Sequence, residues 1–258
     1  MEEPRLEHHL DLLWGHGTDS GRGRPARTTR EQVVAAGIAR ADAEGLAELS
    51  MRAIAADLGV GVMSLYTHVE SRDGLVALMT DHAFAEITGD LYPHDGEPWR
   101  DAAARQARAL WDLYSRHPWI LDHGSRLPMG PHVLALEDAF YAAFLDIGLT
   151  AVDSANAAIA LRSLVTGLAR DSSSEQDQVR RTGVGLMEHW ASVNAIFWDR
   201  YFEQERYPAM TKLWLAGGFE TDDVLAEEGI LERAVAAYLD GIAVRVHSGG
   251  TGRGTGGA

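Results

Sequence analysis

The stretch Ser50-Met-Arg-Ala-Ile-Ala-Ala-Asp-Leu-Gly-Val-Gly-Val-Met-Ser-Leu-Tyr-Thr-His-Val69 decides how this chain folds. Its apolar spacing predicts a short helix buried through Ile54, a turn at Gly59, and a second short helix that starts near Val62 and buries Leu65. Glycine tolerates the left-handed backbone that such a tight turn requires. The stretch therefore predicts a helix-turn-helix, whose second helix can enter a DNA major groove.

The residues on either side extend this unit. Thr28 and Glu31 have the spacing of a capping box, and they predict a helix that runs to near Gly45. Ser71 is the expected cap of a fourth helix that continues to about residue 88. We therefore expect a three-helix DNA-binding domain over residues 28–72.

The remainder of the chain also has helical periodicity, with no sustained alternation typical of strands. We expect an all-α protein, with a larger ligand-binding and dimerisation domain over 73–247. Gly-rich composition predicts a flexible arm over 1–27 and a disordered tail over 248–258. The expected helices of the larger domain cover 98–116, 131–147, 150–171, 175–206 and 223–247.

The sequence resembles the TetR family of bacterial transcriptional regulators. The resemblance is carried by Ala43-Glu44-Gly45, Ser50–Ala55, Leu58-Gly59-Val60, Ser64–Val69 and Arg72–Leu75. His117-Pro118-Trp119 and Leu215–Phe219 resemble the C-terminal domain class of the tetracycline repressor itself. The resemblance implies a ligand-responsive regulator, a repressor that binds a palindromic operator as a homodimer and is released by a small apolar or aromatic molecule.

The resemblance also implies which residues contact DNA. Arg52 is the candidate for bidentate guanine recognition, because its guanidinium matches the acceptors on the guanine edge. Ser64, Tyr66, His68 and Arg72 are expected to bind phosphates, which position the protein without reading sequence. The other expected contacts are Ser50, Met51, Gly61, Val62 and Met63, of which Val62 and Met63 can offer only apolar contacts.

Residues 22–30 contain four arginines and no acidic residue. The core Arg22-Gly-Arg24-Pro25 resembles an AT-hook, and Arg27 follows closely. An extended segment of this kind suits a narrow minor groove with strong negative potential. The alternative is an ordinary basic linker before the first helix of the domain.

Aromatic side chains recur on the expected helices of the larger domain. Most aromatic residues at helical spacing belong to a core, but so many on facing helices suit an apolar pocket with a few polar anchors. The anchor candidates are Arg162, His189 and Asn194. The other candidate pocket residues are Trp111, Tyr114, Phe140, Phe144, Trp190, Val193, Phe197 and Trp198.

Two expected helices, 150–171 and 223–247, are apolar around most of their circumference. Such helices must be buried on two sides, one of which suits a two-fold dimer built through a four-helix bundle. The candidate dimer residues are Ala155, Ile159, Leu231, Val235, Tyr238, Leu239 and Ile242.

Other classes of function find little support. The chain has no cysteine, and its histidines at 94, 117, 123 and 132 match no zinc template. Nucleotide-binding and hydrolase motifs are missing, so we expect neither an enzyme nor a metal or cofactor. No signal peptide or membrane span is expected, which favours the cytoplasm. The rival hypothesis is a small-molecule-binding helical protein whose helix-turn-helix unit is vestigial or binds a protein.

The net charge of −15 argues at first against DNA binding, which depends on neutralising phosphates. The charge is unevenly distributed. Residues 22–80 carry seven arginines and seven acidic residues, whereas residues 81–258 carry 15 basic and 26 acidic ones. The acidity lies mainly on the larger domain, where it can repel phosphate and orient the molecule with the basic arm toward DNA.

Overall fold

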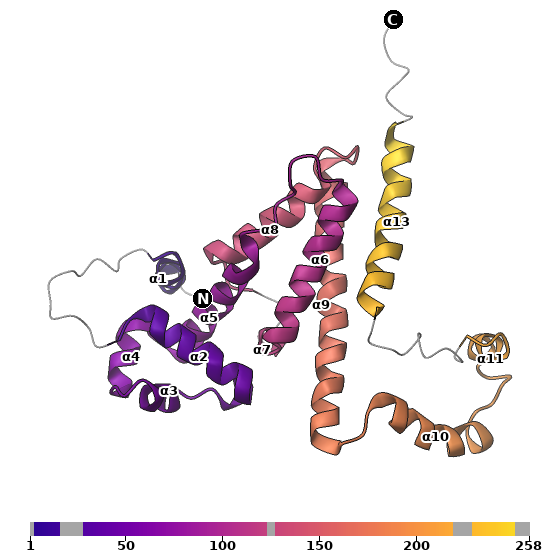
Figure 1. Ribbon diagram of the computed structural model, residues 1–258, viewed down its shortest axis with the longest axis horizontal. Helices are drawn as coiled ribbons and strands as arrows, with labels where there is room; N and C mark the ends of the chain where they lie inside the picture. Colours follow the sequence, from indigo (N-terminus) through magenta and orange to yellow (C-terminus); the bar gives the residue numbers. More distant parts are fainter. Residues whose placement is uncertain (1–2, 16–27, 123–126, 219–228, 251–258) are drawn as a thin grey trace, which may run out of the picture.

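The computed structural model describes residues 3–15, 28–122, 127–218 and 229–250, and every regular element in these ranges is a helix (Figure 1). The expected all-α class is confirmed. In chain order the helices are α1 (Glu3–Trp14), α2 (Arg30–Glu44), η1 (Leu46–Glu48), α3 (Met51–Asp57), α4 (Val62–Val69), α5 (Arg72–Thr88), α6 (Trp99–Arg116), α7 (Trp119–Asp122), α8 (Pro131–Phe144), α9 (Ala151–Thr182), α10 (Leu186–Arg200), α11 (Pro208–Leu215) and α13 (Ile230–Gly250).

Helices α2 to α4 form a small unit, called the head below. Gly59 adopts φ +65° in the turn between α3 and α4, while Ile54 and Leu65 are fully buried beneath it. The helix-turn-helix is therefore confirmed. The capping box is also present, but it is formed by Thr29 and Gln32, one residue later than expected from Thr28 and Glu31. Thr28 is instead buried.

The first 27 residues are not uniformly flexible, so that expectation was wrong for α1. Leu12 and Leu13 are buried, and the Arg30 guanidinium donates to the carbonyl oxygen of Leu12 at 3.2 Å. Trp14 donates its indole N–H to the carbonyl oxygen of Met129 at 3.0 Å. The glycines that suggested a leader start only at Gly15, after the helix has ended.

Helix α5 connects the head to the helices that follow it, α6 to α11 and α13, which are called the body below. It packs against α2 on one side and against α6 and α8 on the other (Figure 1). Ser71 caps it as expected, by accepting a hydrogen bond from the Gly74 N–H at 2.9 Å. Nearly every residue from 74 to 84 is buried, because both faces of the helix are covered.

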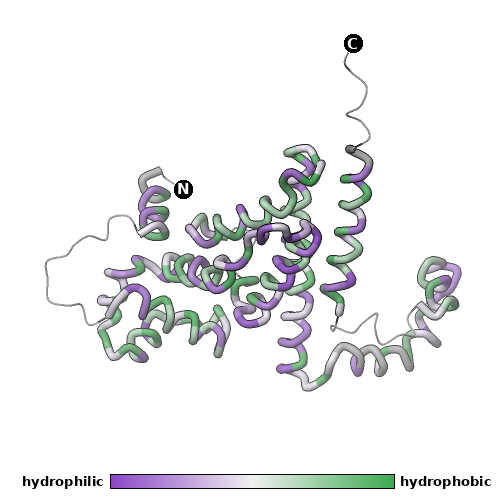
Figure 2. Tube along the Cα trace, turned by 45° about the horizontal axis from the view of Figure 1, so that its top comes forward, coloured by the Kyte–Doolittle hydropathy of each residue, from purple (hydrophilic) through white to green (hydrophobic). Residues whose placement is uncertain are grey.

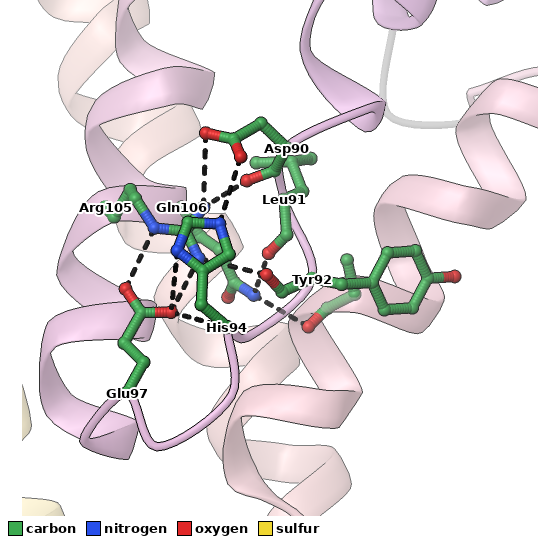
Figure 3. A network of polar contacts seen from close by, with 8 residues as sticks. Asp90, Leu91, Tyr92, His94, Glu97, Arg105 and Gln106 are labelled. Atoms are coloured by element: carbon green, nitrogen blue, oxygen red, sulfur yellow. Dashed lines mark hydrogen bonds and ion pairs between the residues drawn. The ribbon is translucent and has the colours of Figure 1, made fainter.

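A polar network fixes the segment between α5 and α6 (Figure 3). Arg105 on α6 donates to Glu97 and to the carbonyl oxygens of Asp90 and Tyr92. Gln106 donates to the carbonyl oxygens of Leu91 and Ala139, each at 2.8 Å. The hydrogen bond from Arg105 is the main cause that lowers the pKa of Glu97 to about 2.

The expected helix over 175–206 was wrong. Helix α9 continues through Asp171 and Ser172 to Thr182, where Gly183 ends it in the left-handed conformation and donates its N–H to the carbonyl oxygen of Val179. Helices α10 and α11 then lead away from the body (Figure 1). The expected helix over 131–147 is also shorter, since α8 ends at Phe144.

Helix α13 returns alongside α9 and also packs on α6 (Figure 1). It extends to Gly250, so the first three residues of the expected tail over 248–258 are helical, and the rest lie outside the described residues. Hydrophobic and hydrophilic residues alternate along the body helices (Figure 2), as expected for helices with one buried face. Among the described helices, none is long and apolar enough to cross a membrane.

Candidate nucleic-acid interface and ligand cavity

Helix α4 and the residue before it carry most of the expected DNA contacts on an exposed face. Gly61, Met63, Ser64 and Tyr66 are exposed, and Met63 reaches 76% exposure. A large apolar side chain this exposed at the start of a helix can pack against thymine methyl groups. Val62 and His68 are half-buried at the edge of this face.

The start of α3 divides the remaining candidates. Ser50 and Arg52 are exposed beside α4, whereas Met51 is only 8% exposed and belongs to the core of the head. Met51 was therefore wrongly expected to contact DNA. The apolar stripe of α3 already contained it, and this signal favoured burial.

Arg72, for which a phosphate contact is expected, is exposed and also makes hydrogen bonds within the head. Its Nε donates to the carbonyl oxygen of Leu49 at 3.1 Å, and its Nη2 donates to that of Leu46 at 2.6 Å. The side chain thus ties the start of α5 to the segment before α3. Arg30 makes a similar tie, from α2 to the carbonyl oxygen of His68 at 3.1 Å. Arg22, Arg24 and Arg27 lie outside the described residues.

A cavity of about 270 Å³ lies in the body between α6, α7 and α9. Two of the expected pocket residues, Tyr114 and Arg162, line it. Trp111 lines a smaller adjacent recess with Tyr114. The remaining lining comprises Ile120, Leu121, Leu127, Ser163, Thr166, Gly167 and Arg170.

Other expected pocket residues lie elsewhere. Phe140 and Phe144 are completely buried in the core, and Phe144 packs on Trp99 with ring centroids 6.0 Å apart. His189 is exposed on α10, with Val193 half-buried. Phe197 and Trp198 pack on Phe202 instead. The side chains of Trp190 and Asn194 lie outside the described part of α10.

The break at Gly183 explains why α10 does not contribute to this cavity. Its aromatic residues form a local cluster with α11, in which Trp198 stacks on Trp214 at 6.0 Å. Sequence reasoning missed Thr166 and Arg170. The signal was available, because they follow Arg162 at i+4 and i+8 and therefore share its face of the helix.

A polar cluster joins the head to the body close to this cavity. His117, at the end of α6, has Nδ1 2.7 Å from Asp42 Oδ1 on α2 and Nε2 3.1 Å from Glu86 Oε1 on α5. Trp119 donates its indole N–H to the same Asp42 oxygen at 2.7 Å. The imidazole of His117 therefore lies between one carboxylate on α2 and another on α5.

The charge environment of Glu86 agrees with this arrangement. Partial burial would raise the pKa of Glu86, but hydrogen bonds from Arg116 and His117 outweigh it and lower that pKa. His117 and Trp119 are almost fully buried. We call these five side chains, Asp42, Glu86, Arg116, His117 and Trp119, the junction cluster.

Most of the expected dimer residues are already buried within one chain. Leu231, Val235, Leu239 and Ile242 are at most 6% exposed, because they form the inward face of α13. The expectation was wrong for these four. Tyr238 donates its hydroxyl to the carbonyl oxygen of Ala157 at 2.8 Å and is also an internal contact. Ala155 is half-buried and Ile159 is exposed.

The exposed side of the same two helices is apolar. Val152 on α9 is 70% exposed and Val244 on α13 is 67% exposed, and Ile159 adds a further apolar side chain. We call Val152, Ile159 and Val244 the outer face. Among the described residues, no group of three or more potential metal ligands is brought together.

The part of the chain that contains the body matches a family model. Residues 92–246 match the tetracycline repressor-like C-terminal domain. A repressor from Streptomyces coeruleorubidus, the HTH-type transcriptional repressor DrrR1, is 36% identical over 205 residues, which cover 79% of this chain and 75% of that protein. An HTH-type transcriptional regulator from Saccharopolyspora erythraea is 29% identical and covers 81% of this chain and 82% of its own length.

Solved structures of similar fold include the Streptomyces coelicolor TetR family protein ActR. Its apo form superposes with a TM-score of 0.65 at 25% identity, covering 86% of this chain and all of that one. The complex of ActR with (S)-DNPA gives a TM-score of 0.62, also at 25% identity, over 84% of this chain and 99% of the other.

Proposed function

The chain belongs to the TetR family of transcriptional regulators, and we propose that it is a ligand-responsive repressor that binds a palindromic operator as a homodimer. The observation that carries this proposal is the exposed face of α4 on a head whose own core is complete. Leu65 and Val69 are fully buried and form the inner face of α4, so Met63, Ser64 and Tyr66 remain exposed on its outer face, where they can contact DNA.

A dimer would supply a second copy of α4, the helix that is expected to enter the major groove. The outer face offers apolar side chains on two adjacent helices, as an isologous interface requires. Two heads related by a two-fold axis would reach successive major grooves about 34–36 Å apart, which is why we expect a palindromic operator.

The junction cluster supports a route from ligand to head. Ile120 and Leu121 of α7 line the cavity, and α7 begins at Trp119, which is hydrogen-bonded to Asp42 on α2. A ligand that moves α7 would therefore change a direct contact with the head. Helix α5 provides a second route, through Glu86. Such a ligand acts by favouring the state that binds DNA poorly.

The test uses fluorescence anisotropy with the DNA upstream of the protein's own gene. We expect the full chain to bind, and Arg52→Lys to weaken binding by about 1–3 kcal/mol while relaxing the preference at one base pair, since lysine keeps the charge and loses the bidentate fork. Arg200→Lys, on exposed α10, is the matched control.

Two results would count against the proposal. If the chain binds no upstream fragment better than unrelated DNA, the rival function gains, namely a ligand-binding helical protein whose head is vestigial or binds a protein. If Arg52→Lys and Arg200→Lys behave alike, Arg52 does not read a base.

A further inference from the structure

Two arginines and a threonine line the cavity from one face of α9. Arg162, Thr166 and Arg170 are spaced at i, i+4 and i+8, so their side chains lie above one another along the helix. No carboxylate is found among the described residues that line this cavity. A ligand inside it therefore meets two guanidinium groups at close range.

Arg162 presents a donor that the protein itself does not use. Its Nη1 pairs with Glu137 Oε1 at 3.0 Å, which holds the guanidinium in place. Its Nε is buried and has no hydrogen-bond partner. A buried N–H without an acceptor is unfavourable, and a ligand oxygen would remove that penalty.

Arg170 brings a second set of N–H donors to the cavity. Arg170 donates to the carbonyl oxygen of Leu121 at 3.3 Å, which positions its guanidinium near the end of the cavity formed by α7. Thr166 Oγ1 donates to the carbonyl oxygen of Arg162 at 2.8 Å, so it can accept from the Tyr114 hydroxyl, which lies 3.4 Å away. Burial raises the pKa of Tyr114, so its hydroxyl remains protonated and can donate.

The rest of the lining is apolar. Ile120, Leu121 and Leu127 face the same cavity from α7 and the segment before α8. Apolar walls favour an aromatic or aliphatic body, whereas clustered N–H donors favour an anionic group such as a carboxylate, which accepts bidentate hydrogen bonds from arginine.

We propose that the effector of this protein is an organic anion, an apolar ring system with a carboxylate that Arg162 and Arg170 bind. This inference rests on the proposed function and adds the charge of the ligand to it. A neutral amide of the same shape could accept one hydrogen bond from the Nε of Arg162, but it carries no negative charge and cannot accept the paired, charge-assisted hydrogen bonds that a carboxylate accepts from arginine.

The experiment compares acids with their primary amides. Naphthalene-2-carboxylate and anthraquinone-2-carboxylate are titrated into the full-length protein alongside the two amides, and binding is followed by tryptophan fluorescence. We expect each acid to bind at least tenfold more tightly than its amide. Arg170→Gln and Arg162→Lys should each reduce acid affinity about tenfold, whereas Arg200→Gln should leave it unchanged.

The choice of Arg162→Lys protects the fold, because lysine can still pair with Glu137 while the Nε donor is lost. Thermal unfolding of each variant checks that the body is intact. The proposal is overturned if acid and amide bind equally or if neither binds. It is also overturned if the preference for the acid survives in the variant that combines Arg162→Lys with Arg170→Gln.

Operator binding by the ligand-free protein separates the two proposals. If the protein binds its operator but shows no preference for acids, only the proposal of an anionic effector is overturned. If the protein prefers acids but binds no operator, the proposed ligand site stands and the proposed repressor function is overturned.

Discussion

The two ends of α5 are held by different parts of the molecule. At its start, Arg72 donates to carbonyl oxygens of the head, so this end is fixed to the helix-turn-helix. Just past the middle of the helix, Asp81 accepts hydrogen bonds from the backbone N–H groups of His132 and Val133, each at 3.0 Å, and so caps α8 of the body. The difference shows that one helix belongs to the head at one end and to the body at the other.

Mutation of the contact between α5 and the body should lower the free energy of unfolding more than mutation of its contact with the head. Asp81 is 5% exposed, and Asp81→Ala would leave two N–H groups of α8 and the His132 ring without their acceptor. We expect a loss of about 3 kcal/mol in the free energy of unfolding, measured by urea denaturation. Thr150→Ala, which removes an exposed cap of α9, should cost about 1 kcal/mol. Equal losses for the two variants would contradict this ranking.

Glu86, near the end of α5, tests the junction cluster through its pH dependence. Its pKa is lower in the folded protein than the usual 4.5, so its contribution to stability is present above about pH 4.5 and is lost as the pH falls below it. His117→Ala removes one cause of this shift and should cost about 2 kcal/mol at neutral pH.

The measurement is urea denaturation of both proteins between pH 3 and 7. The difference between wild type and His117→Ala should shrink on the acid side, because Glu86 becomes protonated in both. Glu31→Gln is a suitable control, since Glu31 also has a lowered pKa but does not contact the junction cluster. A difference that is constant across the range would show that His117 does not act through Glu86.

Mutation at the head end of α5 should have the smallest effect on the free energy of unfolding. Arg72 is exposed, so Arg72→Ala should cost only about 1 kcal/mol of stability. Because its donors bind carbonyl oxygens, operator affinity should fall without a change in salt dependence. A phosphate contact would instead reduce the slope of log K against log salt by about 1. A reduced slope would restore the phosphate contact that the sequence suggested.

The head was predictable from sequence because its determinants are local. Gly59 and the buried stripe through Ile54 and Leu65 define both helices and the turn within twenty residues. The capping box shifted by one residue, since Thr28 and Thr29 are adjacent and both can cap. The family resemblance implied a DNA contact for Met51, but Met51 shares the buried apolar stripe of α3 with Ile54 and Ala55.

The body was less predictable because its determinants are long-range. The sequence of a helix that is apolar on both sides does not show which side its own chain will cover, so it does not distinguish the inward face of α13 from a dimer interface. The Asp171-Ser-Ser-Ser174 stretch suggested a break, but α9 continues through it and ends at Gly183. The junction cluster joins residues 75 positions apart, and no local pattern indicates such a pairing.

The length of α9 has a mechanical consequence. Its 32 residues span about 48 Å at 1.5 Å per residue. Arg162 and Arg170 line the body cavity near the middle of this helix, while Arg180 and Arg181 line a cleft against the last turn of α2 and η1. Pivoting about its first turn, a tilt of about 5° would displace the far end by about 4 Å. A shift of about 1.4 Å at Arg162 and about 2.5 Å at Arg170 is thereby enlarged before it reaches the head.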